Sequence, residues 1–195
     1  MLPTIVTEAL KEWAVVQRSL LEGHQIILLR KGGLIEETND FDLKAATFAI
    51  QPTYVHETER AGDLQPCFIE WLREEEAKRV KEAQNRVRID CICSATDIVR
   101  VDDRQRLIKL MPQHIWSQSF IDGRYDWDPY KPVFVLICRA YALPSPADIP
   151  WRDEYGGCRS WSTLREPIAT DGATPAMSDD TFARRRELTL SILTS

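Results

Sequence analysis

The chain has 195 residues, of which 44% are hydrophobic and 28% are charged, and its formal net charge is −5. These proportions are typical of a globular protein, and the length is enough for one domain with a sizeable core. The composition excludes a bilayer-spanning segment of ~20 apolar residues, and the charge argues against a nucleic-acid binder that is basic throughout. The first residues also lack the charged and apolar regions of a signal peptide, so we expect a cytoplasmic, soluble protein without a membrane segment.

Five cysteines stand at scattered positions, which is unlike the dense and even set of a disulfide framework. Cys91 and Cys93 have the spacing of half a metal site. Residues two apart on a strand share a face, however, and free cysteine packs as a small hydrophobe. We therefore interpret the pair as two buried thiols in a core.

The first predicted element is an amphipathic helix from about Thr4 to Glu22, because apolar residues recur there at helical spacing and Gly23 follows. A buried strand over 24–31 comes next and runs into Arg30-Lys31-Gly32-Gly33. A double glycine permits positive φ and close backbone approach, so this turn with its two cations can receive a phosphate or a carboxylate. It lacks the GxxxxGK spacing of a P-loop, and an ordinary hairpin turn is the alternative.

A second strand, about 46–51, ends at Pro52, which has no amide hydrogen to donate. His56 follows in a polar loop with two acidic neighbours. A second amphipathic helix is predicted from about Pro66 to Arg86, with its charged residues on a solvated face.

The remaining chain is predicted to be rich in strands. A strand covers 87–101, a short helix follows Asp103, and the loop after it carries His114 and Trp116. The run 133–143 is apolar on both faces, which favours a central strand, and Arg139 within it requires a partner. A second glycine-marked stretch, 155–161, contains two glycines, Cys158, Arg159 and Trp161.

Together these elements predict an α+β fold with a mixed or antiparallel sheet covered by two amphipathic helices. A PUA-like barrel is one form that such a sheet can take. We expect a single domain over 1–165, followed by a linker and a short terminal element over 166–195.

Several stretches of the sequence resemble the domain-of-unknown-function family numbered 1802, which is common in cyanobacteria. They are Ala9-Leu10-Lys11-Glu12-Trp13, Leu28-Leu29-Arg30-Lys31-Gly32-Gly33, Pro52-Thr53-Tyr54-Val55-His56, His114-Ile115-Trp116 and Tyr155-Gly156-Gly157-Cys158-Arg159-Ser160-Trp161. They are spread over most of residues 5–165. The family carries no established activity, so the resemblance implies membership and no function.

Our first functional hypothesis is a module that binds RNA, DNA or a nucleotide. Cations supply charge for phosphate and aromatic rings supply stacking faces. The residues that we expect to converge on one cleft are Arg30, Lys31, Gly32, Gly33, His56, His114, Trp116, Arg124, Arg159 and Trp161. The order of the elements is also loosely similar to small RNA-binding barrels of the PUA-like kind, although fold does not fix function.

The second hypothesis is a metal-dependent nuclease or other hydrolase, in which Glu36 and Asp42 hold Mg²⁺ and Lys44 lies near the attacked phosphate. Outside this alternative we predict no metal and no cofactor.

A third hypothesis is thiol chemistry at Cys158 with His56 or His114 as the base, for which a structural cysteine is the alternative. The fourth is a protein-interaction domain without catalysis. Since no catalytic motif of high specificity occurs, we favour a binding module over an enzyme.

Overall fold

A computed structural model of the protein describes residues 1–31, 43–54, 59–81, 85–127, 131–157 and 159–195. Its strands are β1 (Ile5–Trp13), β2 (Ile27–Lys31), β3 (Thr47–Thr53), β4 (Arg86–Val101), β5 (Val133–Pro150), β6 (Trp161–Ala169) and β7 (Thr174–Pro175). Its α-helices are α1 (Ala14–Leu21), α2 (Ile69–Lys81), α3 (Arg104–Lys109), α4 (Gln118–Asp126) and α5 (Asp179–Thr194). None of the described helices is long and apolar enough to cross a membrane.

The strands form one mixed sheet in the order β2-β5-β4-β3-β1-β6, and β7 pairs with β5. The β1–β3 pair is parallel and the other pairs are antiparallel. The predicted α+β class with a mixed sheet is therefore confirmed. Within the described residues the sheet is not closed into a barrel, because β2 and β6 stand at its two open ends.

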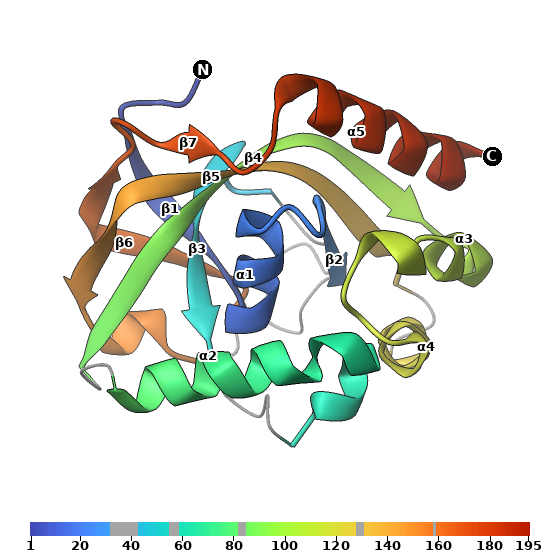
Figure 1. Ribbon diagram of the computed structural model, residues 1–195, viewed down its shortest axis with the longest axis horizontal. Coiled ribbons are helices and arrows are strands. Elements are labelled where there is room, and N and C mark those ends of the chain that lie inside the picture. The colour runs from blue at the N-terminus through green and yellow to red at the C-terminus, as the bar shows by residue number, and fades with distance from the viewer. Residues whose placement is uncertain (32–42, 55–58, 82–84, 128–130, 158) are drawn as a thin grey trace.

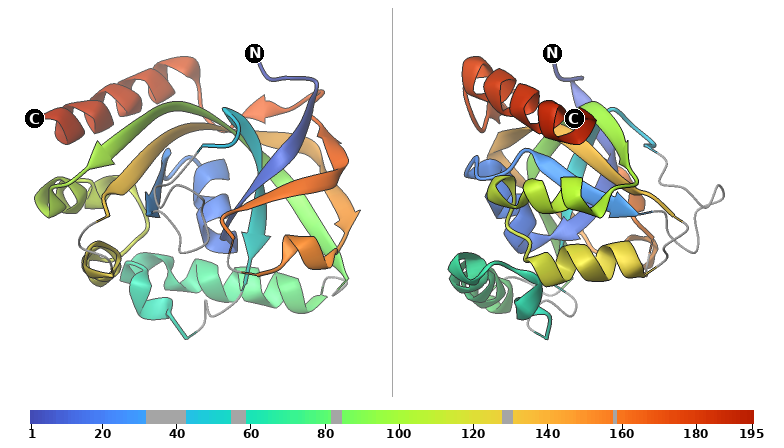
Figure 2. Two further views of the ribbon diagram at one scale, coloured as in Figure 1. Left: turned by 180° about the vertical axis from the view of Figure 1, so that it is seen from behind. Right: turned by 90° about the vertical axis from the view of Figure 1, so that its right-hand side faces the viewer.

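The sheet is strongly curved, and α1 lies on its concave side (Figure 1). The bending coincides with register shifts in the β4–β5 pair between Ile89 and Cys91 and between Ala95 and Asp97. The helix α2 runs along one side of the molecule, while α5 crosses the opposite side (Figure 2). The larger core cluster fills the concave side, where residues of α1 pack against those of β2, β3 and β5.

The first element differs from the sequence prediction. We expected one helix from Thr4 to Glu22, but residues 5–13 form β1 and only residues 14–21 are helical. Ala9 and Leu10 are both fully buried and point to opposite faces of the sheet. Hydrogen bonding to β3 on one side and β6 on the other satisfies the backbone there, so tertiary pairing overrides the helical spacing.

The end of the chain is more regular than the linker and short element that we expected over 166–195. Residues 166–169 belong to β6, and α5 has 16 residues. The α5 side chain Asp179 forms an ion pair with Arg139, which is the partner that the cation in β5 requires. Arg186 of α5 likewise binds Asp97 of β4, with 2.6 Å between its Nε and Oδ2.

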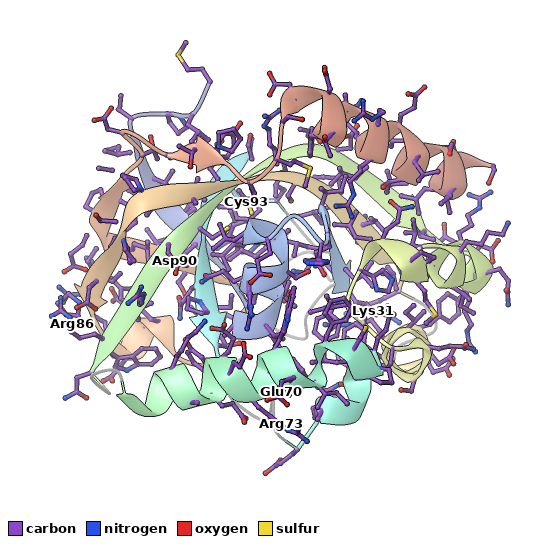
Figure 3. The ribbon with its side chains drawn as sticks, in the orientation of Figure 1. Lys31, Glu70, Arg73, Arg86, Asp90 and Cys93 are labelled. Carbon is purple, nitrogen blue, oxygen red and sulfur yellow. The ribbon has the colours of Figure 1, made fainter. Side chains whose placement is uncertain are left out.

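The cysteine prediction is confirmed where the structure describes it. Cys91 and Cys93 are buried free thiols with 4.0 Å between their sulfur atoms. A hydrogen bond to Cys138, together with burial, raises the pKa of Cys93 well above its ordinary value. This keeps the thiol protonated and unreactive, in the middle of the sheet (Figure 3).

Candidate functional site

A cavity of about 440 Å³ lies where β1 ends and α1 begins. Its lining contains four cations, one carboxylate, two tryptophans and three smaller residues. They are Lys11, Arg30, Arg124, Arg159, Glu12, Trp13, Trp116, Thr53, Gly157 and Ser160.

The parallel pairing of β1 with β3 forms the floor of this cavity. It places Trp13 opposite Thr53, and the Thr53 hydroxyl donates a hydrogen bond of 3.1 Å to the carbonyl of Glu12. Arg30 reaches the same place from β2, where its guanidinium donates to the carbonyl of Lys11 at 2.6 Å. The cavity is thus assembled across the sheet from strands that are distant in the sequence.

Glu12 and Arg30 form a buried ion pair in the cavity, with 3.0 Å between Oε1 and a guanidinium nitrogen. Their exposed fractions are 7% and 9%. The second oxygen of Glu12 accepts a hydrogen bond from the backbone NH of Trp13, whereas the buried Nε of Arg30 has no partner. Arg30 therefore keeps unused donor capacity in spite of its carboxylate.

Arg124 approaches the cavity from α4 and has no carboxylate or hydrogen-bond partner for its guanidinium in the described part of the chain. The guanidinium packs over the Phe120 ring, 5.1 Å from its centroid. Burial, reinforced by the positive charge of Arg30, lowers the pKa of Arg124 to about 10. The group is still a cation at neutral pH, and Glu12 and Asp63 attract it only from a distance, without forming an ion pair in the described residues.

The turn at Gly156 and Gly157 (the wall turn) supplies another part of the wall of the cavity. The ammonium of Lys11 donates to the carbonyls of Gly156 and Gly157 at 2.6 and 3.2 Å. Gly157 has φ of 71°, which side chains other than glycine rarely adopt. Tyr155 is buried next to the turn, and Gln51 donates to its carbonyl at 3.0 Å. These contacts fix the turn, and Arg159 stands exposed at its end.

Aromatic side chains form the remaining wall. Trp116 stacks on Phe120 with 3.9 Å between ring centroids, and its other neighbour, Trp13, meets it edge to face at 5.0 Å. Trp116 is almost completely buried, while Trp13 is half-buried. Trp13 is therefore the more accessible stacking face.

The structure brings together some of the residues that we predicted to converge, but not all of them. Arg30, Trp116, Arg124 and Arg159 line the cavity. Two others, Lys31 and Trp161, do not. Trp161 packs against Phe48 in the core, with 5.2 Å between ring centroids.

Lys31 binds the carboxyl end of α4 instead of the cavity (Figure 3). Its ammonium donates to the carbonyls of Arg124 and Tyr125 at 2.8 and 2.6 Å. A cation at this end of a helix is stabilised by the helix dipole. Lys31 thereby holds the segment that carries Arg124.

His114 lies in the core and is not part of the lining. It is 3% exposed, its Nδ1 accepts a hydrogen bond of 3.2 Å from the NH of Trp116, and burial lowers its pKa to about 4. A neutral imidazole in this place positions Trp116. His114 is therefore not among the residues that line this cavity.

The other predicted site residues, Gly32, Gly33, Glu36, Asp42, His56 and Cys158, lie outside the described residues. In the described part of the chain no group of three His, Cys, Asp or Glu side chains is arranged to hold a metal ion. The nuclease and thiol hypotheses therefore remain predictions.

Sequence reasoning missed six of the lining residues: Lys11, Glu12, Trp13, Thr53, Gly157 and Ser160. The sequence nevertheless contained information about these residues. Each of the five stretches that carry the family resemblance contributes at least one residue to the lining. Arg124 is the one lining residue that comes from elsewhere in the chain.

Two crystal structures of the ASCH protein from Zymomonas mobilis are similar to this structure. A single-site mutant of that protein matches with a TM-score of 0.49 and 10% sequence identity, and the match covers 97% of this chain and 99% of the other. The ASCH structure itself matches with a TM-score of 0.47 and 12% identity, over 82% of this chain and 87% of the other.

No protein with a curated function matches the chain. A family model described as "Domain of unknown function (DUF1802)" matches residues 9–188, which is nearly the whole length and contains every residue of the cavity. The chain therefore belongs to the DUF1802 family.

Proposed function

We propose that the cavity binds a nucleotide or a nucleic acid through its phosphate and one of its bases. The observation that carries this proposal is Arg124, a cation without a carboxylate partner in the described residues, next to the second cation Arg30. Placing a charge in a poorly solvated site without a partner costs free energy, and a bound anion removes that cost.

Phosphate suits the cavity for two further reasons. Arginine donates in a planar fork that matches the oxygens of a phosphate, and Arg30 keeps a free donor at Nε. In addition, α1 begins at Ala14, its N-cap Trp13 forms no side-chain capping hydrogen bond, and its first turn carries no acidic residue. The positive end of this helix therefore adds to the field at the edge of the cavity.

The two tryptophans of the cavity provide a surface on which a base can stack. Trp13 presents a half-buried ring beside the cations, and Trp116 supports it from the inside. Stacking of a base on an aromatic side chain contributes ~1–3 kcal/mol and is tolerant of sequence. A nucleotide can contact both the cations and the tryptophan rings of the cavity, whereas inorganic phosphate can contact only the cations.

The proposal is tested by calorimetric titration of the protein with nucleoside 5′-monophosphates and with short single-stranded RNA and DNA. The variant Arg124→Gln should weaken binding at least tenfold, since it removes the cation without adding bulk. The variant Arg184→Gln is the matched control: it deletes one exposed arginine on α5, away from the cavity. Equal binding by all three proteins, or no binding by any, would contradict the proposal.

A further inference from the structure

We infer that the cavity holds one nucleotide unit, either free or at the end of a strand, and not a tract of single-stranded nucleic acid. This inference rests on the proposed function and concerns the size of the ligand at the same site. Three features carry it: the small volume of the cavity, the small number of its cations without a carboxylate partner in the described residues, and the carboxylates that pair with other cations.

The cavity has the dimensions of a small-molecule pocket. Its volume of about 440 Å³ lies in the lower part of the ~300–1,000 Å³ range of such pockets. Glu12, Arg30 and Trp116 in its lining are each less than a tenth exposed, whereas Gly157 and Arg159 are exposed. A domain that binds a strand instead offers an open groove for ~4–16 nucleotides.

The cations that can neutralise phosphate are few. Arg124 and Arg159 line the cavity without a carboxylate partner in the described residues, and Arg30 shares its charge with Glu12. Lys11 is bound to the carbonyls of the wall turn. This set is enough for one phosphate group, and no further cation of the described residues lines the cavity.

The cations beside the cavity are already neutralised. Arg60, which lies over the Trp13 ring, pairs with Asp63 at 2.6 Å. On the α3–α4 side, Arg104 pairs with Asp122 at 3.5 Å. A second or third phosphate of a strand would meet these carboxylates as well as the arginines, so it would gain little.

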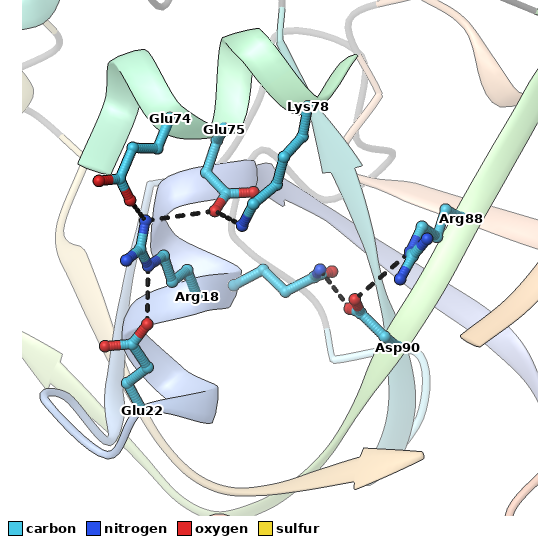
Figure 4. A network of polar contacts seen from close by, with 8 residues as sticks. Arg18, Glu22, Glu74, Glu75, Lys78, Arg88 and Asp90 are labelled. Carbon is cyan, nitrogen blue, oxygen red and sulfur yellow. Dashed lines mark hydrogen bonds and ion pairs between the residues drawn. The ribbon is translucent and has the colours of Figure 1, made fainter. Parts of the chain in front are cut away.

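Cations on α1 and α2 are likewise bound to carboxylates. Arg18 is bound by Glu22 at 2.7 Å and by Glu74 at 2.6 Å, and Lys78 is bound by Glu75 at 2.6 Å (Figure 4). The net charge of −5 also disfavours the approach of a long polyanion to the rest of the protein. We therefore expect nucleotides beyond the first to add little to the binding free energy.

The test is a calorimetric comparison of four ligands on the full chain: a nucleoside, its 5′-monophosphate, a linear dodecanucleotide with a 5′-phosphate and the circular form of that dodecanucleotide. We expect the monophosphate to bind at least tenfold more tightly than the nucleoside. The linear dodecanucleotide should bind within about threefold of the monophosphate if a strand end is accepted, and not at all if only the free nucleotide is. In either case the circle should not bind.

Salt dependence provides an independent readout. For single strands log K falls with log salt by ~0.7 per neutralised phosphate, so one unit predicts a slope near −0.7. A slope steeper than about −2, a linear dodecanucleotide more than tenfold tighter than the monophosphate, or a circle equal to the linear form would each overturn the inference while leaving nucleic-acid binding in place. Absence of binding by every ligand would overturn the proposed function itself.

Discussion

Arg30 of β2 and Arg124 of α4 line one cavity, and the positive charge of Arg30 contributes, after burial, to the lowered pKa of Arg124. Glu12 binds Arg30 directly, whereas Glu12 and Asp63 act on Arg124 only from a distance. Such an arrangement destabilises the ligand-free protein locally and is offset by packing elsewhere. A bound anion relieves the repulsion, so the relationship between these residues predicts both where the ligand binds and how stability responds to it.

Replacing Arg124 by methionine should leave the ligand-free protein as stable as the wild type or more stable. The folded-state pKa of Arg124 lies below the value of the unfolded chain, so the penalty for its charge is fully present at every pH below about 10. Methionine removes that charge and keeps the contact with Phe120. Thermal melts at neutral pH measure the effect.

The same melts with a nucleoside monophosphate complete the test. A ligand present at a hundred times its Kd stabilises a protein by ~2.7 kcal/mol, and one that binds tenfold more weakly stabilises it by ~1.4 kcal/mol, so the wild-type Tm should rise by several degrees and that of Arg124→Met by half as much or less. If the Arg124→Met variant melted well below the wild type without ligand, Arg124 would be a structural residue.

Glu12→Gln should strengthen anion binding and weaken the fold. Glutamine has one acceptor oxygen, so it keeps either the hydrogen bond from Arg30 or the one from the NH of Trp13, and it no longer neutralises the guanidinium. The ligand then meets an uncompensated Arg30, so we expect severalfold tighter binding of the monophosphate. Because the variant leaves a buried charge unpaired, its free energy of unfolding should fall by ~1–3 kcal/mol, part of which the ligand restores. Weaker binding by Glu12→Gln would indicate that the carboxylate itself contacts the ligand.

Lys11 should act by holding the wall turn as well as by its charge. Its ammonium binds the carbonyls of Gly156 and Gly157, and Lys11→Met removes both contacts. We expect severalfold weaker nucleotide binding together with faster amide exchange in the wall turn. Lys11→Arg keeps the charge and alters the geometry, so it separates the two roles. Full binding by the arginine variant with an unchanged exchange rate in both variants would leave charge as the whole explanation.

Part of the site was predictable from the sequence, because cations and aromatic residues near glycine-marked turns predict an anion site. This reasoning found Arg30, Trp116, Arg124 and Arg159. It placed Trp13 in a helix packed on the sheet, since Val6, Leu10 and Trp13 also fit a helical spacing. The deciding information was the pairing of β1 with two neighbours, which no local pattern contains.

Lys31 and Trp161 are residues that the same reasoning placed in the site although they do not line the cavity. Both have the residue type of a ligand-binding group and both are next to a true lining residue, Arg30 or Ser160. Successive residues of a strand point to opposite faces, so a neighbour of a site residue usually points away from the site. Residue type and proximity in sequence therefore overestimate a site that is built on strands.

The helix α5 should be an integral part of the folded core, in contrast to the short terminal element expected from the sequence. Phe182 is 6% exposed and joins the main core cluster, whereas Leu188 on the same helix is 54% exposed. Phe182→Ala should lower the free energy of unfolding by about 3 kcal/mol, and Leu188→Ala should change it by less than about 0.5 kcal/mol. Urea denaturation of the two variants measures this difference, and equal small effects would mean that α5 is a peripheral attachment.

His114 should make the protein sensitive to mild acid. Burial lowers its pKa to about 4 in the folded state, compared with about 6.5 for an unperturbed histidine. Between these two values the unfolded chain binds a proton that the folded protein excludes, so stability falls as the pH decreases through this window. The loss approaches about 3 kcal/mol at the lower end.

Urea denaturation at neutral pH and near pH 5 measures the loss, and it should be clearly smaller in His114→Asn. Asparagine keeps an acceptor for the NH of Trp116 but does not titrate, so the comparison removes the contribution of the carboxylates that also protonate in acid. His24→Asn is the matched control, since it makes the same substitution at an exposed histidine. If His114→Asn lost as much stability in acid as the wild type, the buried imidazole would not be the cause, and its role would be limited to positioning Trp116.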